Sequence, residues 1–197
     1  MLGLRHNRMS FPSKAFEGVV YEFDHLAPLA TTIVLPVTGQ DPVTLPIQVH
    51  FGCHCFTEGF KPGLHQDHHR YTYKEELRAF DLVRYTCSLQ LPNVVKSMIA
   101  AGRVYASQNS YTYVAQMTLK GLHGPQNYSV FFSLERDTRS PQPALRMFVK
   151  SGYLKALAAP AHAASWRFTA LAGQVGGVYP LPTPKPRPLK QAKKKGP

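Results

Sequence analysis

The fold is decided by three stretches of sequence, SYTYVAQMTL (residues 110–119), YSVFFSL (128–134) and LRMFVKSGY (145–153). In each stretch apolar and polar residues alternate, which is typical of a β-strand with one buried face. The turn-forming segments GLHGPQN (121–127) and DTRSPQP (137–143) separate the three. Consecutive strands joined by short turns predict an antiparallel meander.

Elements before and after the meander complete the prediction. Four further strands are expected, at residues 17–24, 31–34, 47–51 and 165–171, the second of them at an edge of the sheet. The helical spacing of apolar residues predicts two helices, at residues 74–87 and 93–105. We therefore expect an α+β fold, in which an antiparallel β-sheet (a meander of about four to six strands) carries two helices on one face.

One domain accounts for most of the chain. The 197 residues suit a single domain, and a hydrophobic share of 44% suffices for a core. We place this domain at residues 1–179 and a tail at residues 180–197. No apolar run approaches the roughly 18 residues that a membrane-spanning helix needs, so no membrane partner is expected. Since no secretory signal is visible either, we expect a cytoplasmic protein.

The charge of the chain points to a polyanionic partner. Lys and Arg number 23 against 11 Asp and Glu, which gives a net charge of +12. The tail, PLPTPKPRPLKQAKKKGP, carries a proline at every second position from 180 to 188 and basic residues without acidic ones. This composition predicts a disordered segment. Its Lys193, Lys194 and Lys195 are expected to bind phosphate groups.

A segment rich in histidine and cysteine offers a zinc site. Residues 52–70 have the glycine and proline content of a loop, and thiolates and imidazoles are ligands that zinc prefers. Cys53 and Cys55 with His65 and His69 would complete a tetrahedral set, although Cys-x-Cys is closer than zinc-finger spacing. The alternative is that both cysteines continue the buried face of the strand at 47–51. Three cysteines make a poor disulfide framework, which favours a reducing compartment.

The same alternation places histidines on the accessible face of that strand. If residues 47–55 stay extended, His50 and His54 lie beside each other, opposite the cysteines. Histidine exchanges protons near neutral pH, and a histidine pair with nearby cations suffices for metal-free RNA cleavage. The candidate catalytic residues are therefore the clustered histidines His50, His54, His65, His68 and His69.

Cations elsewhere are expected to hold the phosphates of a nucleic acid. On the strand at 145–153, Arg146, Phe148 and Lys150 share one face. Such a face suits RNA because cations meet phosphates and aromatic rings stack on bases, and an ordinary solvated sheet face is the alternative. The expected nucleic-acid-binding residues of the domain are Arg70, Arg78, Arg84, Arg146, Lys150 and Tyr153.

Together these features favour a nucleic-acid-directed enzyme, a small basic ribonuclease that acts on RNA without a cofactor. The sequence holds no Walker loop, dinucleotide fingerprint or nucleophile elbow. Its general layout resembles that of small ribonuclease toxins, a likeness of architecture without a shared motif. Two alternatives stay open: a non-catalytic nucleic-acid-binding or assembly protein, and a small zinc-binding protein. A protein partner or inhibitor and the oligomeric state also stay open.

Overall fold

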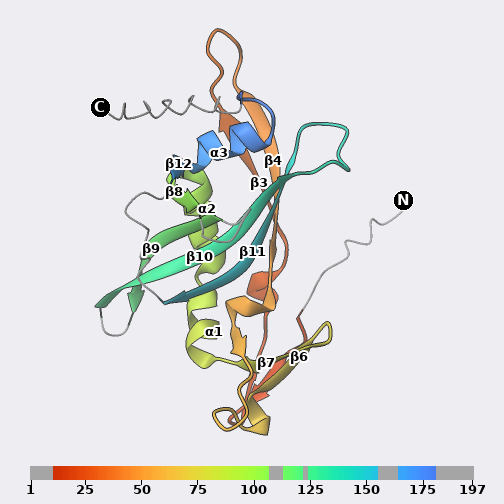
Figure 1. Cartoon of the computed structure of the whole chain (residues 1–197), viewed down its shortest axis with the longest axis vertical. Helices are drawn as coiled ribbons and strands as arrows, with labels where there is room; N and C mark the ends of the chain where they lie inside the picture. The colour runs from red at the N-terminus through yellow and green to blue at the C-terminus, as the bar shows by residue number, and fades with distance from the viewer. Residues whose placement is uncertain (1–10, 107–112, 122–123, 155–163, 181–197) are drawn as a thin grey trace, which may run out of the picture.

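The computed structural model describes residues 11–106, 113–121, 124–154 and 164–180, and its centre is a curled, mostly antiparallel sheet (Figure 1). The strands of this sheet follow the order β12-β8-β9-β10-β11-β4-β3. Only the pair β11 and β4 is parallel. The seven strands are β3 (Leu29–Leu35), β4 (Val43–Phe51), β8 (Arg103–Ala106), β9 (Tyr113–Gly121), β10 (Gly124–Arg136), β11 (Leu145–Leu154) and β12 (Ser165–Arg167). The α+β class and the antiparallel meander are confirmed, but the sheet is larger than the four to six strands expected.

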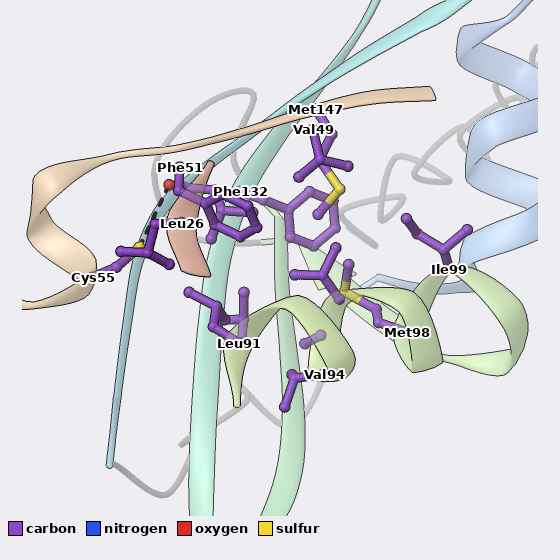
Figure 2. Close-up of a cluster of buried hydrophobic side chains, with 14 of the residues drawn as sticks. Leu26, Val49, Phe51, Cys55, Leu91, Val94, Met98, Ile99, Phe132 and Met147 are labelled. Atoms are coloured by element: carbon purple, nitrogen blue, oxygen red, sulfur yellow. Dashed lines mark hydrogen bonds between the residues drawn. The ribbon is translucent and has the colours of Figure 1, made fainter. Parts of the chain in front are cut away.

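Within the described residues, three α-helices accompany the sheet: α1 (Leu82–Ser88), α2 (Leu91–Ala101) and α3 (Phe168–Val175). Figure 2 shows Met98 of α2 on the side of buried side chains of the sheet, among them Val49 and Phe132. The ring of Phe168 in α3 lies 6.0 Å from that of Phe132. Helices α2 and α3 therefore cover the same face of the sheet, which is called the inner face below.

The predicted helix at 74–87 and the predicted strand at 165–171 are wrong in part. The helix expected at 74–87 is replaced in its first half by the strand β7 (Glu76–Phe80), and α1 begins only after Asp81. The Asp81 carboxylate accepts hydrogen bonds from the amides of Val83 and Arg84, which fixes this start. The strand expected at 165–171 ends at Arg167, because Phe168, Leu171 and Ala172 are buried at helical spacing instead.

A smaller sheet lies at one end of the molecule (Figure 1). It pairs β7 with β5 (Thr57–Gly59) on one side and with β6 (Arg70–Tyr73) on the other. The strand expected at 17–24 is a hairpin instead, β1 (Lys14–Phe16) and β2 (Val19–Tyr21), because Glu17 and Gly18 turn the chain with φ of 51° and 77°. The segment expected to be a loop at 52–70 contains β5 and two short 3₁₀ helices, Cys53–Cys55 and Asp67–His69.

The edge strand expected at 31–34 is β3, which ends the strand order of the large sheet. In the part of the chain that the structure describes, no helix is long and apolar enough to cross a membrane. The expected disorder of the tail, with Lys193, Lys194 and Lys195, lies outside the described residues.

Candidate functional site

The parallel pair of β4 and β11 places the first candidate histidine on the outer face of the sheet. Ile47, Val49 and Phe51 are buried on the inner face. His50 between them is half-buried and stands opposite Phe148 in the register of the pair. The alternation of the sequence predicted this orientation correctly, since it depends on the period of the strand alone.

Directly after β4 the chain leaves the strand. The Gly52 amide donates to the carbonyl of Val149, and residues Cys53–Cys55 form a 3₁₀ helix. Both cysteines are buried as expected, but the helix buries them rather than a continued strand. The Cys55 thiol donates to the Val149 carbonyl at 3.7 Å (Figure 2), and burial raises the pKa of Cys55 to about 12.

His54, at the centre of that 3₁₀ helix, is held by a carboxylate. Its Nε2 lies 3.0 Å from both carboxylate oxygens of Glu76, and 40% of the side chain is exposed. Arg78 donates to Glu76 at 2.7 Å and to the hydroxyl of Thr57 at 2.7 Å. The hydrogen bond from His54 and the contact with Arg78 hold the pKa of Glu76 below its usual value. Glu76 is thus kept ionised and keeps the His54 ring in one orientation.

Lys74 reaches the site from a tight turn. The turn between β6 and β7 has Lys74 and Glu75 at its centre, with φ of 48° and 68°. Positive φ at both positions defines a type I′ turn, which normally favours Asn and Gly. Two side-chain-bearing residues therefore hold a left-handed backbone conformation here, and strain of this kind is common at functional sites.

This strained turn gives a stability prediction. The substitution Glu75→Gly is expected to raise the free energy of unfolding by about 0.5–1 kcal/mol, because glycine adopts positive φ without a steric cost. Urea unfolding of both proteins measures the change. Thr72→Gly in the extended strand β6 is the control and should destabilise the protein. Equal destabilisation by both substitutions would contradict a strained turn.

Two pockets meet at Lys74 and Phe148. The His54 pocket has a volume of about 350 Å³, and the His50 pocket has a volume of about 450 Å³. Volumes of this size are typical of sites for small molecules or single groups of a larger ligand. The His54 pocket is lined by Phe51, Gly52, Cys53, His54, Tyr73, Lys74, Glu76, Phe148 and Lys150. The His50 pocket is lined by His50, Lys74, Ser133, Glu135, Arg139, Arg146, Met147 and Phe148.

His50 has the features of a neutral imidazole. Burial lowers its pKa, and the positive charges of Arg146 and Arg139 lower it further. Its Nδ1 is buried and has no hydrogen-bond partner among the described residues. At pH 7 the ring is therefore uncharged and able to accept a proton.

Three of the predicted catalytic histidines line neither pocket. His65 uses both ring nitrogens, with Nε2 2.9 Å from Glu58 and Nδ1 accepting from the Lys61 amide at 2.9 Å. His68 and His69 pack their rings against Phe16. These three histidines order the segment between β5 and β6. The density of histidines in the sequence did not distinguish them from the two histidines that line the pockets.

Some of the predicted nucleic-acid-binding residues line the pockets, and others are held by contacts within the fold. Arg146 and Lys150 line the pockets. Arg78 is buried against Thr57 and Glu76, and Arg70 pairs with Asp67 at 2.8 Å. Arg84 and Tyr153 lie against each other, since Arg84 pairs with Asp81 and its guanidinium lies 4.9 Å from the Tyr153 ring.

The predicted zinc set of Cys53, Cys55, His65 and His69 is not brought together. Among the described residues, the group of three or more ligand residues whose atoms lie within 4.8 Å of one another consists of Cys53, His54 and Glu76. In this cluster Arg78 already supplies a positive charge to Glu76, and burial raises the pKa of Cys53. In this cluster His54 and Arg78 thus both contact the Glu76 carboxylate.

Sequence reasoning missed the residues contributed by the small sheet. Lys74 and Glu76 were assigned to a helix, so their approach to His54 was not foreseen. Glu135 and Arg139 come from the end of β10 and the turn after it. In the sequence, Arg139 lies within the turn predicted at residues 137–143.

Comparison with known proteins assigns a family. The model of the YjaZ family matches residues 13–176, a range that includes every residue lining the two pockets. No curated protein matches the chain, and no solved structure matches it.

Proposed function

The chain belongs to the YjaZ family, and from its two pockets we propose that it is a nucleic-acid-directed enzyme, a small basic ribonuclease that works without a metal. The observation that carries the proposal is the meeting of two pockets, each with one histidine, at Lys74 and Phe148. A phosphate bound at this junction has a proton acceptor on one side and a proton donor on the other.

The two histidines take different parts in the proposed reaction. Neutral His50 accepts the proton of the ribose 2′-hydroxyl, whose oxygen then attacks the adjacent phosphorus. His54, whose Nε2 lies beside the Glu76 carboxylate, gives a proton to the departing 5′-oxygen. The P–O bond to that oxygen breaks, and the products are a 2′,3′-cyclic phosphate and a 5′-hydroxyl. Lys74 stabilises the negative charge of the pentacovalent phosphorus between them.

Cations along the pockets support binding of a phosphate backbone. Lys150 lines the His54 pocket, and Arg139 and Arg146 line the His50 pocket. The Asp137 carboxylate lies 3.1 Å from Arg139 and holds it at the rim. These three cations and Lys74 line two adjoining pockets, so that neighbouring phosphates of one backbone could each meet a positive charge.

Incubation of the purified protein with labelled RNA and single-stranded DNA, with and without a chelator, tests the proposal. Cleavage of RNA that resists the chelator is expected, and DNA should stay intact because it lacks the 2′-hydroxyl. Bound but intact RNA would favour the non-catalytic nucleic-acid-binding or assembly protein. Cleavage abolished by the chelator would instead indicate a metal-dependent reaction, with Cys53, His54 and Glu76 as the metal site.

Salt dependence tests the binding surface separately. Arg146→Ala is expected to lower the slope of log Kd against log salt concentration by about 0.7, because one contact with a single-stranded phosphate backbone is lost. Lys96→Ala is the matched control, since Lys96 lies exposed on α2, on the opposite side of the sheet. Equal slopes for both variants would show that the pockets do not hold the backbone.

A further inference from the structure

Resting on the proposed function, we infer that the substrate is single-stranded RNA and that the ring of Phe148 stacks on an unpaired base next to the phosphate that is cleaved. Three features point to this role of Phe148: the exposure of its side chain, the backbone beneath its ring and the walls of the two pockets.

The exposure of Phe148 is unusual for its place in the fold. Its neighbours Met147 and Val149 are fully buried on the inner face, whereas 41% of Phe148 is exposed. An exposed aromatic ring in the middle of a strand of the central sheet loses the free energy that burial would give it. A ligand that covers this ring would gain that free energy of burial on binding.

Gly52 fixes the ring in place. A Cβ atom at Gly52 would lie 3.1 Å from the Cζ atom of Phe148 and 3.0 Å from the carbonyl oxygen of Lys150. Only a residue without a side chain leaves room for the Phe148 ring against the backbone here. The ring is thereby held between the strand of His50 and the 3₁₀ helix of His54, so it is ordered before a ligand binds.

The walls of the pockets select an unpaired strand. The large sheet contributes Phe148 and Lys150 on one side, and the turn of the small sheet contributes Tyr73 and Lys74 on the other. The Lys74 ammonium lies 5.4 Å from the centre of the Tyr73 ring. A base must leave its helical stack to reach a ring between these walls, which an unpaired strand allows at little cost and a duplex resists.

Binding of two RNAs of equal length, one single-stranded and one base-paired, tests the inference. The wild-type protein should bind and cleave the single strand in preference. Phe148→Ala should weaken binding of the single strand by about 5- to 150-fold, the range found for loss of one base–aromatic stack, and leave duplex binding unchanged. Phe148→Tyr keeps a ring and should bind as the wild type does. Leu64→Ala, which removes another exposed apolar side chain outside both pockets, should have no effect.

The outcomes separate this inference from the proposed function. Equal binding of both RNAs, or unchanged binding by Phe148→Ala, would overturn the role of Phe148 while metal-free cleavage still supported a ribonuclease. Single-strand binding that depends on Phe148 without any cleavage would uphold the stacking site and overturn the ribonuclease. Absence of binding to either RNA would overturn both. Thermal unfolding of Phe148→Ala verifies that the variant is folded.

Discussion

Replacing His54 by alanine is expected to lower kcat for RNA cleavage by about 100- to 10,000-fold, the usual contribution of a general acid. The departing 5′-oxygen would then leave without a proton, and no other histidine of the described residues lines the His54 pocket. The Kd for RNA should change by less than about threefold, because the imidazole is not among the cations that hold the backbone. Single-turnover cleavage and filter binding measure the two quantities.

Two further histidine variants make the result specific. His50→Ala should cause a loss of similar size, since it removes the proton acceptor. His68→Ala should keep the wild-type rate, because its ring packs on Phe16 and His69 away from both pockets. A His54→Ala rate within threefold of the wild type would remove the proposed proton donor. Equal losses in all three variants would point to a general effect on folding.

The features of the site that depend on strand period followed from the sequence. His50, Arg146, Phe148 and Lys150 lie on the outer face, as alternation along their strands required. A strand with one buried face fixes the direction of each side chain locally. For this reason the part of the site that lies on the large sheet was predictable without knowledge of the pairing.

The part contributed by the small sheet was not predictable in the same way. Residues 76–80 (ELRAF) are too few for a period of two to be told from a helical period. Their pairing with β5 and β6 decides the outcome, and these partners lie at residues 57–59 and 70–73. The turn at Lys74 and Glu75 lacks the Asn-Gly pattern that announces a hairpin. Lys74 and Glu75 occupy positions that normally hold Asn and Gly. This explains both the strain of the turn and the absence of a hairpin signal in the sequence.

The position of His54 shows how a correct inference was reached for an incorrect reason. Alternation placed His54 on the accessible side, and it is accessible, but the chain there is a 3₁₀ helix. The strand ends at Phe51, and at Gly52 the Phe148 ring occupies the space that a side chain would need. This close approach involves residues about a hundred positions apart, which no local pattern reports.

Loss of the Phe56 ring is expected to have the largest effect on stability. Phe56 is fully buried directly after the 3₁₀ helix of His54. Its ring stacks on Phe23 with a centroid distance of 3.9 Å and meets the rings of Phe11 and Tyr71 edge-on at 5.0 and 5.1 Å. Phe56→Ala should lower the free energy of unfolding by about 3–5 kcal/mol, because a cavity replaces a ring that neighbouring aromatic rings enclose. Urea unfolding followed by circular dichroism measures the change.

This aromatic cluster also connects the small sheet to the candidate site, so loss of the Phe56 ring should also lower the rate of RNA cleavage. Tyr71 belongs to β6, and the Phe56 carbonyl accepts from the amide of Asp81 at the end of β7. The turn that carries Lys74 is thus held next to the His54 helix through Phe56 and its neighbours.

At a temperature where Phe56→Ala is still folded, cleavage should fall while binding at Arg146 persists. Phe56→Leu, which refills most of the cavity, should restore both stability and cleavage in part. A change in stability below about 1 kcal/mol for Phe56→Ala would show that these rings do not form a core.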